Sequence, residues 1–132
     1  MLDSTRVPLG PEYDALTEQV IGAAIAVHRE LGPGLLEAVY QAAMELELKA
    51  QGIAVEPQKR LIVHYRGQDV GESKADFVVG GILVVELKAV SEMNPVHRAQ
   101  LHHYLRVGRY RLGLLLNFHR VVLREGIERV IL

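Results

Sequence analysis

The sequence predicts an α/β sandwich with a mixed central sheet, in the element order ααβββαββ. Two observations lead to this prediction. The first third of the chain repeats apolar residues every three or four positions, as amphipathic helices do, and from about residue 61 the pattern changes to short apolar runs typical of strands. Three such runs follow one another closely before a further helical pattern, which predicts an antiparallel meander followed by a crossover helix.

Length and composition indicate one folded domain. At 132 residues, 49% of them hydrophobic, the chain is long enough for a single core. We assign residues 1–13, which contain Pro8, Gly10 and Pro11, to a flexible N-terminal tail and residues 14–132 to the domain. The net charge of −1 gives no global preference for a polyanion. Without cysteine, a signal-peptide stretch or an apolar run long enough for a bilayer, we expect a cytoplasmic protein with no membrane partner.

Two helices are expected first. The helix from Asp14 is ended by Gly-Pro-Gly at 32–34, because proline cannot continue it. A second helix is expected from Leu35 to Gln51, with Gly52 as its C-cap. The apolar stripes expected to face the core are Leu16, Val20, Ala24, Val27 and Leu31 on the first helix, and Leu36, Val39, Ala43 and Leu46 on the second.

The remaining strands and the third helix are expected after the spacing of apolar residues changes near residue 61. We expect meander strands at 61–65, 72–79 and 82–90, and a third helix with Pro95 at its first position that runs to about Val107. Two or three further strands come from 111–118, 120–123 and 127–132.

Acidic residues stand at unusual places in the meander. Asp76 interrupts one apolar strand and Glu86 interrupts the next, although carboxylates are depleted in strands. Lys88 shares a face with Glu86, because strand side chains alternate. Two carboxylates on neighbouring strands suit Mg²⁺ or Mn²⁺, and Lys88 would then orient an attacking water or stabilise charge on a phosphate. A structural ion pair between Glu86 and Lys88 is the alternative.

The metal hypothesis carries a geometric condition. Opposite residues of an antiparallel pair point to the same face. A two-residue loop of Gly80 and Gly81 would place Asp76 opposite Val85 and turn Glu86 away from it. The hypothesis therefore requires a loop of odd length centred near Gly81, or a bulge.

Two helical pairs complete the candidate residues. Glu37 and Tyr40 share one face of the second helix, and Gln100 and Tyr104 share one face of the third. Taken alone, Glu37 also fits a solvated helix surface, and Tyr40 fits a core aromatic with its hydroxyl at the edge.

The combined pattern resembles the GxxExxY proteins, a family placed in the PD-(D/E)XK nuclease superfamily, over roughly residues 17–132. The motifs that carry the resemblance are Gly34-x-x-Glu37-x-x-Tyr40, Ala75-Asp76, Glu86-Leu87-Lys88 and the pair Gln100 and Tyr104. It implies a PD-(D/E)XK restriction-endonuclease-like core and a metal-dependent nuclease that hydrolyses phosphodiester bonds, with DNA as the substrate by analogy.

The resemblance also implies roles for single residues. Glu37, Asp76, Glu86 and the backbone carbonyl of Leu87 would hold Mg²⁺ or Mn²⁺, and Lys88 would act as the base-like catalytic residue. Tyr40, Lys74, Gln100 and Tyr104 would support the site or contact nucleic acid. Lys74 departs from the family, which often has arginine there, so the charge is kept while bidentate phosphate recognition is lost.

Other interpretations stay open. The same core fits a nucleic-acid-binding or protein-binding module with little or no catalysis. A ligand-binding domain would instead show a deep apolar pocket. The aliphatic C-terminal stretch 120–132 would offer an edge strand for a homodimer.

Histidines and arginines near the third helix invite two further hypotheses. We reject a zinc site at His97, His102 and His103, because their spacing is not that of a helical zinc pair, and we place His28 on a helix surface. A phosphate-binding surface and a solvated basic face explain the basic residues equally well: Lys59, Arg60, Arg98, Arg106, Arg109 and Arg111.

Overall fold

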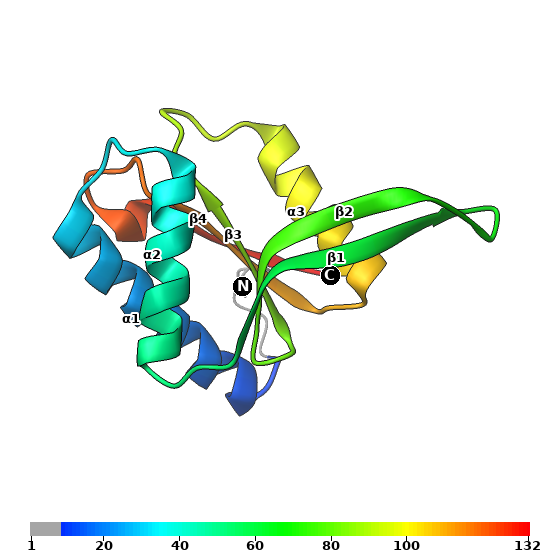
Figure 1. Cartoon of the computed structure of the whole chain (residues 1–132), viewed down its shortest axis with the longest axis horizontal. Coiled ribbons are helices and arrows are strands. Elements are labelled where there is room, and N and C mark those ends of the chain that lie inside the picture. Colours follow the sequence, from blue (N-terminus) through cyan, green and yellow to red (C-terminus); the bar gives the residue numbers. More distant parts are fainter. Residues whose placement is uncertain (1–8) are drawn as a thin grey trace, which may run out of the picture.

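A computed structural model describes residues 9–132 and contains a five-stranded sheet covered by helices (Figure 1). In chain order the elements are α1 (Pro11–Leu31), α2 (Glu37–Ala50), β1 (Val55–Tyr65), β2 (Gln68–Val79), β3 (Leu83–Lys88), α3 (Pro95–Gly108), β4 (Leu112–Asn117), the 3-10 helix η2 (Leu123–Gly126) and β5 (Ile127–Ile131). This order confirms the predicted ααβββαββ arrangement.

The sheet is mixed, as predicted. Its strands lie in the order β1-β2-β3-β4-β5, and the first three form an antiparallel meander. Helix α3 crosses over between β3 and β4, which are parallel, and β5 returns antiparallel to β4. A parallel pair needs such a long crossover because a tight turn can join only antiparallel neighbours.

Helices cover both faces of the sheet. Side chains of α1 and α2 pack with one face in a core that includes Tyr40, Phe77 and Leu87. Helix α3 covers the other face, where Leu101 packs with Val84. This confirms the α/β sandwich. Within residues 9–132, no helix combines the length and the apolar character that a bilayer crossing requires.

Helix α1 begins earlier than the sequence pattern predicts. Its first residue is Pro11 rather than Asp14, so residues 11–13, expected in a flexible tail, are helical. Proline is well suited to this position because the first helical N–H has no partner in any case. Leu9 and Tyr13 also pack against the core, whereas residues 1–8 of the expected tail lie outside the described part of the chain.

The buried face of α2 differs from the predicted one. The core receives Tyr40, Met44 and Leu48, all fully buried, while Leu36 and Leu46 are 78% and 72% exposed. The helix carries two apolar stripes, and its periodicity does not say which one meets the sheet. The C-cap is Gln51 rather than the predicted Gly52. Gly52 follows it with a φ of 73°, its N–H donates to Lys49 O, and the N–H of Ile53 donates to Leu48 O, at 3.0 Å each.

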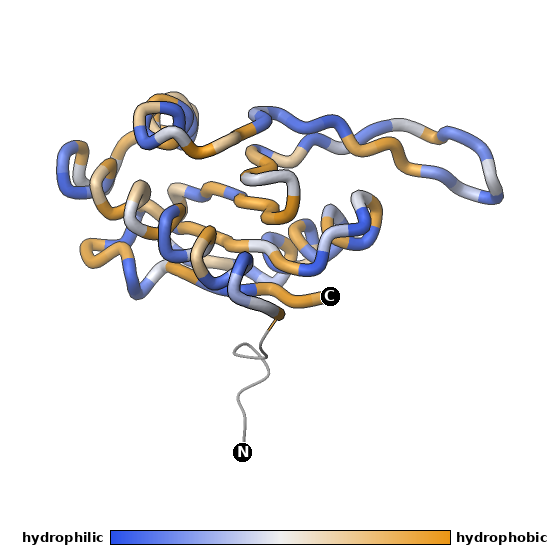
Figure 2. Tube along the Cα trace, turned by 90° about the horizontal axis from the view of Figure 1, so that it is seen from below, coloured by the Kyte–Doolittle hydropathy of each residue, from blue (hydrophilic) through white to orange (hydrophobic). Residues whose placement is uncertain are grey.

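Strands β1 and β2 begin earlier than predicted, at Val55 and Gln68 rather than at residues 61 and 72. Strands β1 and β2 extend to the turn at 66–67, and their outer halves leave the body of the molecule as a two-stranded arm (Figures 1 and 2). Strand β3 is shorter than the predicted 82–90. The predicted strand at 120–123 is wrong, since residues 120–122 form a bend and Leu123 begins η2.

Candidate metal centre

The hairpin between β2 and β3 meets the geometric condition of the metal hypothesis. Its register pairs Phe77 with Val85 and Val79 with Leu83, which leaves a three-residue loop centred on Gly81. Gly80 and Gly81 both have positive φ (61° and 74°), a conformation that favours glycine. The loop of odd length places Asp76 opposite Glu86 rather than opposite Val85.

Where β2 and β3 separate, the side chains of Asp76 and Glu86 take the place of backbone carbonyls as hydrogen-bond acceptors. The last register pair is Phe77 with Val85. Beyond it, the N–H of Asp76 donates to Glu86 Oε1 at 2.6 Å, and the N–H of Leu87 donates to Asp76 Oδ2 at 2.8 Å. Both side chains are nearly buried, with 8% and 4% exposure. Each carboxylate thus satisfies a backbone donor that the separating strands leave without a partner.

Asp76 and Glu86 form the centre of a carboxylate cluster, and helix α2 contributes two further residues to it. Gln41 Nε2 donates to Asp76 Oδ1 at 2.8 Å. Glu37 lies one turn earlier, and the charges of Lys88 and Asp76 both affect its pKa. Sequence reasoning missed Gln41, although its spacing of four residues from Glu37 places both on one helix face. That signal has meaning only once Glu37 is known to face the sheet.

Helix α3 approaches the cluster from the other side. Lys88 Nζ donates to Gln100 Oε1 at 3.4 Å, a long hydrogen bond. Tyr104 is almost buried, and the charges of Glu86 and Asp76 act on its hydroxyl. The structure therefore brings together six of the predicted site residues: Glu37, Asp76, Glu86, Lys88, Gln100 and Tyr104.

Tyr40 lies in the core, away from these carboxylates. Its ring stacks on Phe118 with a centroid distance of 4.6 Å. Its hydroxyl donates to Gly32 O at 2.5 Å and accepts from Leu35 N at 3.1 Å. Tyr40 thereby holds the turn before α2, and this turn sets where Glu37 begins the helix.

Lys74 stands apart from the carboxylate cluster. It is exposed on β2, two residues before Asp76, and pairs in register with Arg60 of β1. Among residues 9–132 its side chain forms no ion pair. Its ammonium is thus free to meet an anion that approaches along β2.

Burial and mutual repulsion make the cluster poor at holding negative charge. Burial, and then the charge of Asp76, raise the pKa of Glu86 to about 8. Burial also raises the pKa of Asp76, although the N–H of Leu87 and the charge of Lys88 oppose the rise. The pKa of Glu37 is raised by burial as well. A positive charge bound among these groups would relieve the repulsion.

Tyr104 stays protonated beside the carboxylates. Burial, followed by the charges of Glu86 and Asp76, raises its pKa to about 12. A phenol of this kind remains a hydrogen-bond donor at neutral pH.

The donor chemistry fits a hard divalent cation. Asp76, Glu86 and Glu37 offer carboxylate oxygens and Leu87 a carbonyl oxygen, the ligand types that Mg²⁺ and Mn²⁺ prefer. Three of the four carboxylate oxygens of Asp76 and Glu86 already accept hydrogen bonds. Within the described chain, no three acidic or histidine side chains converge as a ready metal cluster.

A buried amide holds the segment that follows β3. Asn117 Nδ2 donates to Val90 O at 2.9 Å, and its Oδ1 accepts from Val90 N at 3.2 Å. Sequence reasoning missed Asn117, which ends an apolar strand in the same way as Lys88 ends β3. Buried asparagine at a strand end is the signal that would have found it.

The histidines do not gather at the cluster. His28, expected on a helix surface, is instead buried, and its Nε2 donates to Arg120 O at 2.8 Å. His97 accepts from Asn94 N as part of a helix cap. His103 is hydrogen-bonded to Ser73 Oγ at 3.3 Å. Each ring thus has a separate structural partner.

Three of the six basic residues near α3 form separate ion pairs. Arg98 pairs with Glu128 of β5, while Lys59 pairs with Glu56 and Arg60 with Glu72. The partners lie on different elements and share no common centre. This favours the solvated basic face over a single phosphate-binding surface.

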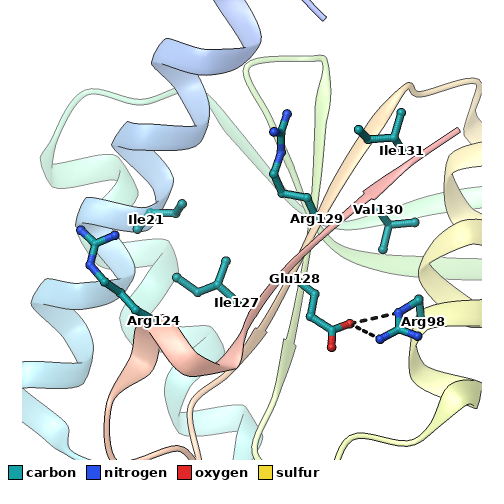
Figure 3. A pocket seen from close by; sticks show the side chains of 8 residues that line it. All are labelled: Ile21, Arg98, Arg124, Ile127, Glu128, Arg129, Val130 and Ile131. Atoms are coloured by element: carbon teal, nitrogen blue, oxygen red, sulfur yellow. Dashed lines mark hydrogen bonds and ion pairs between the residues drawn. The ribbon is translucent and has the colours of Figure 1, made fainter. Parts of the chain in front are cut away.

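A large pocket lies elsewhere, along the edge strand β5 (Figure 3). Its volume is about 730 Å³, and it is lined by Ile21 of α1, Arg98 of α3, Arg124 of η2 and residues 127–131. In Figure 3, Glu128 turns toward Arg98 while Arg129 points away from both. Glu37, Asp76 and Glu86 do not line this pocket, so it is separate from the candidate metal site.

Comparisons with known proteins agree with this arrangement. A family model described as the PD-(D/E)XK nuclease superfamily matches residues 14–130. The solved structure named "Crystal structure of SSO0001" shares the fold, with a TM-score of 0.51 and 18% sequence identity over 90% of this chain. This chain spans 56% of that structure. A search of the curated proteins finds no match.

Proposed function

Because this chain belongs to the PD-(D/E)XK nuclease superfamily, we propose that it is a nuclease that hydrolyses phosphodiester bonds in DNA, with Mg²⁺ or Mn²⁺ as its cofactor. The observation that carries the proposal is the hairpin of β2 and β3. Its three-residue loop sets Asp76 and Glu86 opposite each other, next to Lys88. A purely structural ion pair would not need a second buried carboxylate, Asp76, whose charge adds to burial in raising the pKa of Glu86.

The proposed roles follow from position. Asp76, Glu86, Glu37 and the Leu87 carbonyl would hold the cation. When bound, the cation would lower the pKa of a water molecule and offset negative charge on the phosphate. Gln41 keeps the Asp76 carboxylate oriented through its 2.8 Å hydrogen bond.

Two residues from the α3 side act on the substrate in this proposal. Lys88, held by Gln100, would place its ammonium beside the attacking water or the phosphate. Tyr104, protonated at neutral pH, would donate a hydrogen bond to the nucleic-acid backbone or to a site carboxylate. Exposed Lys74 would contact the backbone as a point charge.

We further propose that the chain is a GxxExxY protein within the superfamily. Gly34 has a φ of 99°, which favours glycine in the turn before α2. Glu37 is the first residue of α2, and Tyr40 ties the turn to the core. The three motif residues thus have one combined effect, which is to present a carboxylate to the Asp76 cluster. A cytoplasmic location and a homodimer through the edge strand β5 stay predictions.

The test combines metal binding with cleavage. Mn²⁺ is titrated calorimetrically into the wild type, Asp76→Asn and Asp69→Asn, and each protein is incubated with labelled single-stranded and double-stranded DNA and RNA. Asp69 is the matched control, because it is exposed on the arm and accepts a hydrogen bond only from Gly71 N. We expect saturable binding and metal-dependent cleavage in the wild type and control, and the loss of both in Asp76→Asn.

The outcomes separate the candidate functions. Absence of saturable Mn²⁺ binding in the wild type would contradict the metal site. Metal binding without cleavage of any substrate would favour the binding module on the same core. Cleavage of RNA but not DNA would correct the substrate and leave the reaction intact.

A further inference from the structure

Helix α2 exposes an apolar stripe that its sequence pattern predicts to be buried. The stripe runs from the N-cap residue Leu36 along Val39 and Leu46 to Ala50, with the half-buried Ala43 between them. Leu36, Val39 and Leu46 are 78%, 42% and 72% exposed. Single exposed aliphatic residues are ordinary on protein surfaces, but a continuous helical stripe marks an interaction surface.

The stripe borders a groove between α1 and α2, which lie side by side (Figure 1). The groove has a volume of about 310 Å³. Its lining from α1 is Ala26, Val27, Glu30 and Leu31, and from α2 is Ala43, Leu46, Glu47 and Ala50. The small alanine side chains in this lining allow another backbone to approach closely, and the aliphatic side chains can pack around it.

The negative charges in the groove indicate which kind of segment could bind there. Glu30 and Glu47 line the groove, and neither forms an ion pair among residues 9–132. Nearby Lys49 is already paired with Glu45. A second copy docked symmetrically by this face would bring the same carboxylates together, which is unfavourable. A segment with basic residues beside its apolar stripe complements both features.

We propose that the groove between α1 and α2 docks an amphipathic helix of another protein, whose aliphatic stripe packs on Leu31, Val39 and Leu46 and whose flanking lysine or arginine residues pair with Glu30 and Glu47. The docked helix lies away from Asp76 and Glu86, because the exposed stripe is on the side of α2 opposite Gln41. This inference does not rest on the proposed nuclease activity.

The experiment uses the full chain and two designed helical peptides. Both carry leucine at a and d heptad positions, with lysine at the flanking positions in one and glutamate in the other. Fluorescence anisotropy measures binding at low and high salt. We expect saturable binding of one lysine peptide per chain, about tenfold tighter than that of the glutamate peptide and weakened by salt.

Three variants locate the binding site. Leu46→Asp should abolish binding, while Val70→Asp, the same change at an exposed residue of the arm, should leave it unchanged. The double variant Glu30→Lys and Glu47→Lys should reverse the preference and bind the glutamate peptide more tightly. Because all four positions are partly or largely exposed, circular dichroism should show folded proteins.

Several results would overturn the proposal. They are failure of both peptides to bind, equal binding of the two peptides, and unchanged binding by Leu46→Asp. Sedimentation equilibrium of the wild type and Leu46→Asp measures whether the chain forms a dimer through this groove. A wild-type dimer that dissociates in Leu46→Asp would assign the groove to a second copy of the chain instead.

Discussion

The backbone N–H of Asp76 donates to the Glu86 carboxylate at 2.6 Å, at the point where the two strands that carry these residues separate. The reciprocal contact runs from the N–H of Leu87 to Asp76 at 2.8 Å. These contacts hold two acidic side chains close together and nearly buried. Such an arrangement costs stability whenever both groups are ionised, which is the pattern expected of a functional site rather than of a structural one.

Stability should therefore fall as pH rises through the range in which Glu86 titrates. Its pKa is raised from the ordinary 4.5 to about 8, so between these values the folded chain keeps a proton that the unfolded chain loses. The free energy of unfolding then decreases with pH, by at most about 1.4 kcal/mol per pH unit for one proton. Glu86→Gln should flatten this slope, as measured by urea denaturation from pH 5 to 8.

The matched control for this prediction is Glu18→Gln, at an exposed position of α1. It should keep the wild-type slope. An equal slope in Glu86→Gln and the wild type would show that Glu86 does not hold the proton in the folded chain.

Gln41 should act as a positioning residue for Asp76. Gln41→Met keeps a similar volume but removes the donor to Asp76 Oδ1, and hydrogen bonds to charged groups contribute about 1.5–3 kcal/mol. We expect Mn²⁺ affinity to fall about tenfold and the pH profile of cleavage to move to higher pH, because this donor favours the ionised carboxylate. Gln19→Met on exposed α1 should leave both unchanged. A fall in activity with an unshifted profile would point to a general structural effect instead.

Tyr40 should stabilise the fold through the turn before α2. Tyr40→Phe retains the ring that stacks on Phe118 and removes the hydroxyl contacts to Gly32 and Leu35. The expected loss is about 1–2 kcal/mol in the free energy of unfolding. Tyr65→Phe, at a 67% exposed position of the arm, should have no measurable effect. Equal stability of the two variants would remove the turn-anchoring role.

The β2–β3 loop should depend on the absence of a side chain at Gly80. A Cβ there would lie 2.7 Å from Leu16 Cδ2, in addition to the strain at a φ of 61°. Gly67 has a similar φ of 76° but nothing within 4 Å of such an atom. Gly80→Ala should therefore destabilise the protein by about 1 kcal/mol more than Gly67→Ala in thermal or urea denaturation, because the Leu16 side chain must shift. Equal losses would attribute the whole effect to backbone strain.

The local sequence pattern was sufficient to select two carboxylates of the candidate site. Asp76 and Glu86 stand out because charges rarely occur within apolar strands, and the spacing of strand side chains required an odd loop, which the register has. Gln41 lay beyond that reasoning, since the contact joins residues 35 positions apart and depends on the angle at which α2 crosses the sheet.

What the sequence by itself determined is the fold class, the element order and the two strands that carry the carboxylates. Those features depend on periodicity and turn residues, which act between neighbours in the chain. Only the tertiary structure decided which stripe of α2 is buried, that His28 lies inside, and that Lys59, Arg60 and Arg98 pair with carboxylates on three different strands. Each of these depends on how elements pack against one another, and two apolar stripes on one helix satisfy the same local pattern equally well.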